Sequence, residues 1–592
     1  MLRTHHLGSL EQSQVGQDLV LCGWVARVRA VGEINFVVLR DRYGVIQLNL
    51  SAALLAEQKL SREDCVKVSG VLQMRPESDR TQEINGCFEV LVKEIEILNS
   101  SEVPPFVVDG KEGVAEDLRL KHRYLDLRSR KMTTNLEIRH RVIRTIREVL
   151  DNLDFLEVET PLLMKSTPEG ARDFLVPSRV FPGEFYALPQ SPQIYKQIVQ
   201  VSGLDRYYQF ARCFRDEDPR NDRQMVHTQM DLEMSFVEES DVFNVIETML
   251  HRVFKEILGK EIQVPFQRLG YAEAMRRFGS DKPDLRFSLE LMDLNQYFQG
   301  TDHPAIGNAI ESGGRVAGMV VPGGAALSRK ELDGFSEFVK TYRAQGTFFL
   351  KCSEEGFVSG ATKLIPESLR GQLFKESGVQ AGDLILFIAG EEPTTSQALG
   401  YLRNRVARTL HEKTGNFIEQ NSHRFLWITD FPLFEYDEDR ACWQAMHHMF
   451  TMPREEDLKY LESGELEKVH GRLYDLVLNG VELGSGSIRI HKAGLQEKIF
   501  EVIGFSKEDA QQRFGFFLES LSFGAPPHGG IALGVARLVM TLLELENMRD
   551  VIAFPNASSC RYLLDDSPTT VTNEQLDELG IQILQSEDNK EK

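Results

Sequence analysis

The chain has 592 residues, of which 42% are hydrophobic and 27% charged, so its length predicts about four domains and its composition predicts a globular protein. No apolar run approaches the length that crosses a bilayer, and Met1 to Leu10 lack the apolar core of a signal peptide, so we expect a cytoplasmic protein outside membranes. The net charge of −21 argues against non-specific binding to nucleic acid.

Residues 19–98 predict a small barrel of β-strands. Alternating apolar residues and β-branched side chains indicate the strands, and a helix-like segment, Ala52–Leu60, follows the third of them. The expected strands are Leu19–Val25, Ile34–Arg40, Val45–Leu50, Val66–Leu72 and Cys87–Leu98. This arrangement is typical of an OB-type barrel, which is a platform for single-stranded nucleic acid.

Four side chains lie on or beside the strands that would form the binding face of this barrel. Arg27 and Arg29 carry positive charge, Phe36 is aromatic, and Gln47 can form hydrogen bonds with the edge of a base. We expect them to bind single-stranded nucleic acid. The alternation of the strand supports equally the alternative that Phe36 belongs to the barrel core.

A basic stretch follows the barrel. Pro104 and Pro105 end the barrel, and the segment from Arg119 to Arg147 is dense in Arg, Lys and His. A locally basic face on an acidic protein suits a nucleic acid that is bound at one place and then released. The alternative is a solvated surface helix that binds nothing.

A helix is predicted over residues 136–150 because apolar residues recur on one of its faces. Those residues are Ile138, Val142, Ile146, Val149 and Leu150, whereas Arg139, Arg141, Arg144 and Arg147 fall elsewhere. A strand, Phe155–Thr160, comes next and stops at Pro161. Helix, strand and proline in this order are common in proteins, so packing alone accounts for them.

Two charged segments and an insertion come after this strand. Phe214-Arg215-Asp216-Glu217 ends one predicted strand, and a polar loop leads to a returning strand, His227 to Phe236. From about Pro283 to about Gln420 the pattern changes to mixed strands, helices and Gly-rich turns, which indicates an inserted domain. Near the C-terminus, Gly529 to Arg537 is a Gly-rich turn that opens a helix, where backbone can lie close to a flat ligand and Arg537 can meet a phosphate.

The segment that ends at Pro161, the hairpin around Arg215 and the turn before Arg537 resemble, in this order, the three motifs of class II aminoacyl-tRNA synthetases. Further segments are similar to the aspartyl branch of that family. They are Ser166–Phe174, Gln190–Gln197, Met446–His448 and Gly484–His491. The inserted domain is similar to that of the bacterial members of this branch.

The resemblance implies an α+β multidomain protein with an N-terminal OB-fold β-barrel and a class II antiparallel-sheet catalytic domain with an inserted α/β domain. The expected parts are an anticodon-binding barrel (1–105), a hinge (106–135), a catalytic domain in two pieces (136–282 and 421–555), the inserted domain (283–420) and a C-terminal extension (556–592). The first motif implies a homodimer, since it forms the subunit interface in this class.

The activity that the resemblance implies is aspartate–tRNA ligation, in which ATP and aspartate form aspartyl-adenylate and the aspartyl group passes to the 3′ end of tRNA(Asp). Such a transfer depends on positioning and on neutralising charge. The implied catalytic residues are Arg215, Glu217 and Arg537. The implied ATP site comprises Arg215, Asp216, Glu217, Gln224, His227, Glu482, Gly534, Val535, Ala536 and Arg537, with Mg²⁺ held by Asp475 and Glu482.

Aspartate has an anionic side chain, so its pocket needs fixed cations. Arg489 can form a two-pronged fork with a carboxylate, and Lys196 adds a point charge. The resemblance implies that the aspartate site comprises Glu169, Ser191, Gln193, Lys196, Arg215, Asp231, His447, His448 and Arg489. Among the departures from the family, His227 stands where a stacking Phe is usual, and Ala536 where a carboxylate is usual.

Three rival functions are open from the sequence. The first is an enzyme of the same branch that acts on asparagine or lysine, and Arg489 with Lys196 argues against it because they suit an anion. The second is a catalytically dead RNA-binding paralogue, which would not need Arg215, Glu482 and Arg537. The third is an amino-acid ligase that uses no tRNA, which would not need the barrel.

The choice of tRNA is a separate question. Members of this branch are either strict for tRNA(Asp) or relaxed, so that they also charge tRNA(Asn). Relaxed forms often carry a His followed by two glycines before the second barrel strand, and strict forms often carry Leu. Val31-Gly32-Glu33 stands there in this chain and resembles the apolar, strict form.

Overall fold

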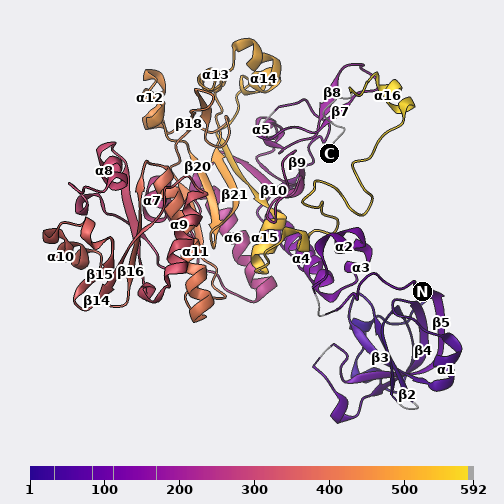
Figure 1. Cartoon of the computed structure of the whole chain (residues 1–592). Helices are drawn as coiled ribbons and strands as arrows, with labels where there is room; N and C mark the ends of the chain where they lie inside the picture. The colour runs from indigo at the N-terminus through magenta and orange to yellow at the C-terminus, as the bar shows by residue number, and fades with distance from the viewer. Residues whose placement is uncertain (32–33, 83, 111–112, 168–169, 585–592) are drawn as a thin grey trace. The chain divides into compact units, whose positions relative to one another are not determined.

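The computed structural model describes the chain except for residues 32–33, 83, 111–112, 168–169 and 585–592 (Figure 1). The described chain forms two compact units that interleave in sequence. Unit 1 comprises Met1–Arg141, Asp218–Met225 and Leu545–Leu576. Unit 2 comprises Val142–Glu217, Val226–Glu544 and Asp577–Lys592.

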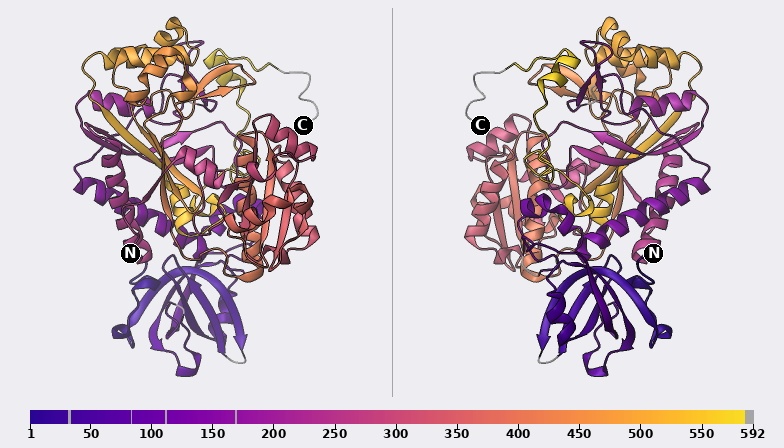
Figure 2. Two further views of the ribbon diagram at one scale, coloured as in Figure 1. Left: turned by 90° about the vertical axis from the view of Figure 1, so that its left-hand side faces the viewer. Right: turned by 90° about the vertical axis from the view of Figure 1, so that its right-hand side faces the viewer.

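The N-terminal part of unit 1 is a closed barrel, as predicted. Its elements are β1 (Asp18–Val31), β2 (Ile34–Arg40), β3 (Val45–Ser51), α1 (Ala52–Gln58), β4 (Cys65–Met74) and β5 (Phe88–Asn99). The strands close in the order β1-β2-β3-β5-β4. The barrel is the indigo part of the ribbon in Figure 2. Alternate residues such as Leu21, Val37 and Val66 are fully buried in its core. Strand β1 is longer than predicted, because it continues past Val25 after a shift in register.

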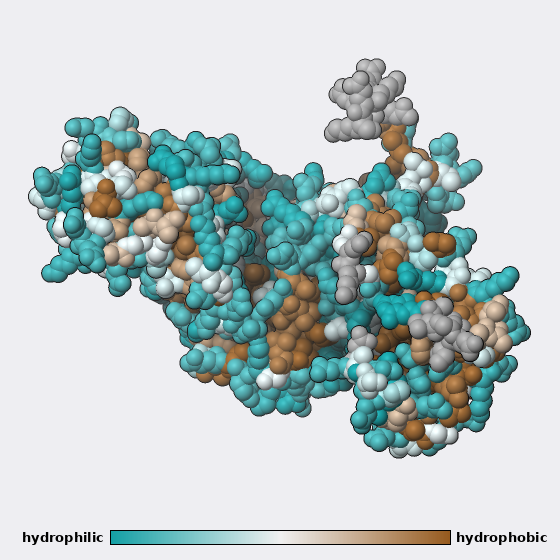
Figure 3. Space-filling model, turned by 60° about the horizontal axis from the view of Figure 1, so that its bottom comes forward, coloured by the Kyte–Doolittle hydropathy of each residue, from teal (hydrophilic) through white to brown (hydrophobic). Residues whose placement is uncertain are grey.

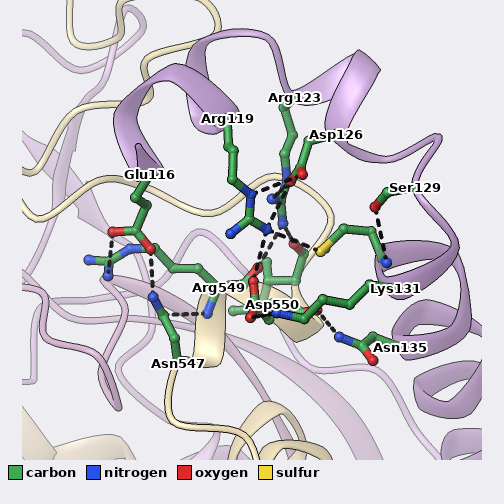
Figure 4. Close-up of polar contacts among 12 residues, drawn as sticks. Glu116, Arg119, Arg123, Asp126, Ser129, Lys131, Asn135, Asn547, Arg549 and Asp550 are labelled. Atoms are coloured by element: carbon green, nitrogen blue, oxygen red, sulfur yellow. Dashed lines mark hydrogen bonds and ion pairs between the residues drawn. The ribbon is translucent and has the colours of Figure 1, made fainter. Parts of the chain in front are cut away.

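The rest of unit 1 joins the basic stretch to the C-terminal segment. Its helices are α2 (Glu116–Lys121), α3 (Arg123–Asp126) and the first part of α4 (Arg130–Asn152). Arg119 contacts Asp126 and Asp550 at 2.9 and 3.0 Å, and Lys131 contacts Asp550 at 2.7 Å (Figure 4). The buried Arg123 donates to the backbone carbonyls of Arg549 and Ile552 at 2.7 Å. Arg119, Arg123 and Lys131 therefore make contacts inside unit 1.

Unit 2 is built on a twisted sheet of eight strands. Its strands, in spatial order, are β11 (Gln267–Gly270), β17 (Phe425–Thr429), β20 (Leu473–Leu478), β21 (Val481–Ile488), β22 (His528–Gly534), β10 (Val226–Ser235), β9 (Arg206–Phe214) and β6 (Leu156–Glu157). The central pairs are antiparallel, and the edge pairs β11–β17 and β6–β9 are parallel. The predicted strand Phe155–Thr160 shrinks to the two residues of β6, because only those residues pair with β9.

Helices and two small hairpins surround this sheet. They are α5 (Gln193–Val201), α6 (Glu239–Leu258), α7 (Tyr271–Phe278), α12 (Leu458–Ser463), α13 (Ala493–Val502), α14 (Lys507–Leu521), α15 (Val535–Leu542), β7–β8 (Leu175–Pro177, Phe185–Ala187) and β18–β19 (Phe434–Asp437, Cys442–Ala445). A short helix near the C-terminus, α16 (Asn573–Leu579), is divided between the two units. In α4, Val142, Ile146 and Leu150 are fully buried. Its apolar stripe therefore serves packing inside the fold.

A second sheet in unit 2 lies between Leu291 and Gly390. Its strands, in spatial order, are β12 (Leu291–Asp293), β13 (Arg315–Val321), β16 (Leu384–Gly390), β14 (Phe348–Ser353) and β15 (Gly356–Gly360). Its helices are α8 (Pro304–Glu311), α9 (Arg329–Lys340), α10 (Glu367–Glu376) and α11 (Thr394–Thr414). Alternate β16 residues pack on α9 and α11 on one face and on α8 and α10 on the other, giving three layers.

The surface is mostly hydrophilic, and hydrophobic side chains gather in smaller patches (Figure 3). Within the described residues, none of the helices is both long enough and apolar enough to cross a membrane. Exposed hydrophobic residues include Leu156, Leu162 and Leu163, at and just after β6. A run of apolar side chains at a sheet edge is a feature of surfaces that meet other molecules.

Candidate active site

Two buried cations and two buried carboxylates meet above the centre of the large sheet in unit 2. Lys196 lies on α5, Asp231 and Glu233 lie on β10, and Arg489 directly follows β21. All four are at most 1% exposed. The Lys196 ammonium lies 2.9 Å from Asp231 Oδ1 and 3.3 Å from Glu233 Oε2. Two positive charges thus balance two negative ones, as burial of charge requires.

Arg489 is held by its neighbours on every side. Its Nε and Nη2 donate to Glu233 Oε1 and Oε2 at 2.9 and 3.1 Å, and its Nη1 lies 2.7 Å from both His448 Nε2 and Ser487 Oγ. The sequence predicted that Arg489 turns its two-pronged fork to a ligand carboxylate. In the structure, the Nε–Nη2 fork binds Glu233. A ligand would meet the Nη1 side in place of His448.

A glycine makes the approach of Glu233 possible. Gly530 on β22 pairs with Glu233 on β10. A Cβ atom at Gly530 would lie 2.0 Å from the carbonyl oxygen of Leu232 and 2.4 Å from Glu233 Oε2. Any side chain there would force the strands or the carboxylate apart. The glycine-rich segment before Arg537 thus shapes the pocket floor.

The charges of the pocket set its protonation states. Burial alone would raise the pKa of Glu233, but Arg489 and Lys196 hold it below its usual value. Burial raises the pKa of Asp231 despite the nearby Lys196. Burial and the positive charge of Arg489 lower the pKa of His448 well below its usual 6.5. His448 is therefore neutral and can leave Arg489 without carrying a charge.

Further predicted pocket residues contribute polar atoms. Gln193 is the first residue of α5, and its backbone N–H donates to Ser191 Oγ at 3.3 Å. Gln193 Nε2 and Arg215 Nε are buried, and within the described part of the chain neither has a hydrogen-bond partner. Buried donors of this kind are rare unless a ligand or water satisfies them. Their geometry is that of a site prepared for a polar ligand.

Asp475 and Glu482 lie on the neighbouring strands β20 and β21. Burial and the negative charge of Glu482 raise the pKa of Asp475 well above its usual value. Asp475 Oδ1 is buried and has no hydrogen-bond partner among the described residues. The pair fits Mg²⁺, which takes oxygen ligands and keeps waters and phosphates in its shell. Among the described residues, no group of three or more His, Cys, Asp or Glu could hold a metal ion.

His447 lies close to these carboxylates. Its Nδ1 is 3.0 Å from Ser485 Oγ and 3.7 Å from Asp475 Oδ1. Burial lowers the pKa of His447 although Glu482 and other carboxylates act in the opposite direction. The two adjacent histidines therefore serve different partners, since His448 faces Arg489 and His447 faces the Asp475 side.

The third predicted motif places Arg537 beside this pair of carboxylates. Gly534 caps the N-terminus of α15, Val535 and Ala536 come next as buried residues, and Arg537 Nη1 donates to the backbone carbonyl of Glu482 at 3.0 Å. An arginine in the first turn of a helix adds to the positive field of the helix N-terminus.

The second predicted motif forms the hairpin of β9 and β10. The backbone N–H of Asp216 donates to the backbone carbonyl of Arg172 at 3.1 Å, just after β9 ends. His227 on β10 pairs in register with Cys213 on β9. Glu217 is half-buried at the end of this hairpin strand in unit 2.

Glu169 lies outside the described residues. Gln224 belongs to unit 1, where its Oε1 accepts from the backbone N–H of Asn556 at 3.1 Å.

The predicted anticodon residues share one outer face of the barrel in unit 1. Arg29, Phe36 and Asn49 are neighbours across β1, β2 and β3, and Arg27, Val38 and Gln47 form the next row. Phe36 is half-buried, whereas its neighbours in sequence on the inner face belong to the core. The alternative that Phe36 is a core residue is therefore not supported. Gln47 Nε2 donates to Glu89 Oε2 at 2.9 Å.

Sequence reasoning missed three residues of the cluster. Glu233 lies two positions after Asp231 on one strand, and this spacing places both side chains on the same face. Ser487 lies two positions before Arg489, and Ser485 two before that. In a strand, residues two positions apart point to the same face, so this spacing could have predicted Glu233, Ser487 and Ser485 as neighbours of the pocket residues. The spacing did not reveal that Arg489 would bind Glu233.

Known proteins share this sequence and geometry. Residues 115–558 match the family described as tRNA synthetases class II (D, K and N), and residues 19–98 match the OB-fold nucleic acid binding domain. The chain is 46% identical over 588 residues to an aspartate–tRNA ligase of Macrococcus caseolyticus, with 98% of each chain covered. It is also 46% identical over 590 residues to an aspartate–tRNA(Asp/Asn) ligase of Desulfatibacillum aliphaticivorans, again with 98% of each covered.

A solved structure shares the fold. The asparaginyl-tRNA synthetase of Pyrococcus horikoshii, complexed with asparaginyl-adenylate, superposes with a TM-score of 0.59 at 17% identity. The match covers 94% of this chain and 99% of that one. At this identity the likeness concerns the fold alone.

Proposed function

The chain belongs to the class II aminoacyl-tRNA synthetases of the D, K and N group, and from that premise we propose that it is an aspartate–tRNA ligase. It activates L-aspartate with ATP to aspartyl-adenylate and transfers the aspartyl group to the 3′ end of tRNA(Asp). The observation that carries the proposal is the buried pair Lys196 and Arg489, each held by carboxylates of β10. Fixed, desolvated cations suit an anionic side chain better than an amide or an ammonium.

The first step joins two anions. The α-carboxylate of aspartate attacks the α-phosphate of ATP, pyrophosphate leaves, and no covalent bond to the protein forms. Arg215 supplies positive charge where the carboxylate and the α-phosphate meet, and its buried Nε is a donor for one of them. Arg537 on α15 binds the terminal phosphates. Mg²⁺ bound by Asp475 and Glu482 would neutralise the phosphates and orient the leaving group.

Recognition of aspartate depends on an exchange of partners at Arg489. The side-chain carboxylate of aspartate replaces the neutral His448 on Nη1, while Glu233 keeps the Nε–Nη2 side in place. Lys196 adds positive charge near the carboxylate, and Asp231 and Gln193 are partners for the α-ammonium and the backbone of the substrate. Asparagine would leave the site with an unneutralised positive charge, which disfavours it.

The barrel binds the anticodon in this proposal. Phe36 stacks on a base, Arg27 and Arg29 contact the backbone, and Gln47 reads a base edge. Gln47 is oriented for this task by its hydrogen bond with Glu89. The outward row of Arg29, Phe36 and Asn49 supports the assignment because all three side chains face away from the core.

The enzyme acts as a homodimer in the cytoplasm in this proposal. The apolar stripe of α4 is buried inside the fold, so the interface is formed by β6 and the segment up to Leu163. Leu156, Leu162 and Leu163 are 52%, 48% and 51% exposed there. Two-fold pairing would bury them. Sedimentation of the full chain at micromolar concentration tests this, and an active monomer would contradict it.

Strict choice of tRNA(Asp) is the first proposal and relaxed charging of tRNA(Asn) the second. The apolar Val31 supports strict choice, while Gly32 and Glu33 lie outside the described residues. The relaxed form is favoured by relatives named aspartate–tRNA(Asp/Asn) ligases at 46% identity. Charging of purified tRNA(Asn) with aspartate decides between them, and a rate within a few-fold of that for tRNA(Asp) would establish the relaxed form.

A further inference from the structure

A lysine to which none of the motifs assigns a role lies in the segment between α7 and the second sheet. Asp281 and Lys282 come just after α7 in sequence and lie beside the proposed metal carboxylates in space. The Lys282 ammonium is 3.7 Å from Glu482 Oε2 and 3.7 Å from Asp281 Oδ1. It also interacts electrostatically with Asp475.

Helix α11, which packs on the second sheet, holds this segment in place. A Cβ atom at Gly279, the C-cap of α7, would lie 2.0 Å from the carbonyl oxygen of Ser396, and one at Gly400 would lie 2.2 Å from the carbonyl oxygen of Gly279. The two backbones therefore touch directly, three residues before Lys282. Tyr401, the next residue of α11, also interacts electrostatically with Lys282. The inserted sheet thus reaches the proposed metal site through α11.

The charges around Lys282 explain its position. Asp475 is buried and Glu482 is 33% exposed, and the two carboxylates lie close enough to interact electrostatically. A third carboxylate, Asp281, faces the same ammonium. The Lys282 side chain is 46% exposed, so it can move away on its flexible stem. The Lys282 ammonium therefore supplies one positive charge beside the carboxylates that would hold Mg²⁺.

We propose that Lys282 is the resident counter-cation of the metal site: it neutralises Glu482 before nucleotide arrives and releases Glu482 when Mg²⁺ enters with ATP. This inference rests on the proposed assignment of Asp475 and Glu482 to Mg²⁺. Lys282 is a positioning residue that acts through Glu482. It makes the site prefer Mg²⁺ that arrives with phosphates over free Mg²⁺, because the phosphates add anionic partners for the displaced ammonium beyond Asp281.

The test measures binding of MgCl2 alone, without nucleotide, to the full chain by calorimetry. Lys282→Met keeps the apolar stem and removes the charge, and we expect it to bind Mg²⁺ about tenfold more tightly than the wild type, since a half-exposed ion pair contributes modestly. Lys282→Arg keeps the charge and should bind like the wild type. Lys255→Met is the matched control, because Lys255 on α6 forms an ion pair with Glu261, which follows that helix, at 2.7 Å.

Two outcomes would overturn the inference. Equal affinity of the wild type and Lys282→Met for Mg²⁺ would make Lys282 an ordinary surface lysine. Weaker binding by Lys282→Met would mean that the lysine assists the metal rather than competing with it. Aspartate-dependent pyrophosphate exchange by the wild type tests the proposed function separately. Mg²⁺ affinity does not depend on the identity of the amino acid, so the role of Lys282 can fail while the proposed function holds, and the two results can be told apart.

Discussion

Arg489 is the residue on which the proposed choice of aspartate depends. It is fully buried and its partner Glu233 is buried with it. Replacing Arg489 with Ala removes the substrate's counter-charge and leaves Glu233 without its main partner, so we expect adenylate formation to fall by at least about a thousandfold, the equivalent of about 4 kcal/mol.

Arg489→Lys is the control for this prediction, because it keeps a positive charge but has no two-pronged fork. It should fold better than Arg489→Ala and regain only part of the activity. The measurement is aspartate-dependent exchange of pyrophosphate into ATP, with circular dichroism as a check on folding. An unchanged exchange rate in folded Arg489→Ala would remove Arg489 from the pocket.

His448 makes stability depend on pH. Its pKa lies well below 6.5 in the folded protein because of burial and Arg489, whereas the unfolded chain binds the proton near 6.5. Between these values the unfolded state holds the extra proton, so stability falls as pH falls through 6.5, by up to about 1.4 kcal/mol per pH unit. His448→Gln cannot bind this proton. When the pH falls from about 7 to about 5.5, the unfolding free energy of His448→Gln should decrease less than that of the wild type. The difference between the two decreases should be at most about 2 kcal/mol.

Urea unfolding at the two pH values measures this difference. Loss of the same free energy by the wild type and by His448→Gln would show that His448 already carries a proton in the folded state. His470→Gln is a suitable control, because His470 is a partly exposed surface histidine that pairs with Asp457 at 2.9 Å.

At the scale of elements, the pairing of β10 with β22 places the pocket. Gly530→Ala should destabilise unit 2 by about 1–3 kcal/mol, because the new methyl group meets the Leu232 carbonyl and Glu233. Gly334→Ala is the matched control: it lies in α9 with nothing within 4 Å of its Cβ position, so it should stabilise by about 0.5–1 kcal/mol. Thermal unfolding of both variants measures the contrast. A neutral Gly530→Ala would contradict the close approach.

Elements with a clear period were predicted well. Strand β2 has its predicted bounds, and the barrel closes as expected, because alternation between core and surface determines each of its strands. The predicted strand Phe155–Thr160 was too long, since a sequence cannot show how many residues find a partner on β9. The division of the fold into two interleaved units also depends on contacts between residues hundreds of positions apart, such as Arg119 with Asp550.

The sequence predicted which residues belong to the candidate site better than it predicted which of their side chains are in contact. Lys196 pairs with Asp231, and Glu233 contacts both Lys196 and Arg489, whereas the roles of these residues toward aspartate stay predictions. Glu233 was missed because a buried carboxylate facing an arginine looks, in sequence, like any other strand residue. Lys282 was missed because its neighbours Glu482 and Asp475 come from strands about two hundred positions later. Ion pairs of this kind are long-range features that no local pattern encodes.

At the scale of the whole molecule, the barrel should affect tRNA but not the first reaction step. Phe36→Ala removes the stacking surface, and stacking on an aromatic side chain is worth about 1–3 kcal/mol per base. We expect the tRNA concentration needed for charging to rise by about ten- to a hundredfold while pyrophosphate exchange stays unchanged. A loss of exchange in folded Phe36→Ala would contradict this division of labour.

The central claim is that this chain charges tRNA(Asp) with aspartate. The most direct test supplies the purified full chain with ATP, Mg²⁺ and single amino acids, measures pyrophosphate exchange, and then measures charging of unfractionated tRNA. We expect exchange with aspartate and far less with asparagine or lysine, followed by formation of aspartyl-tRNA that requires tRNA(Asp). Exchange that prefers asparagine or lysine, or no exchange with any of the three, would contradict it.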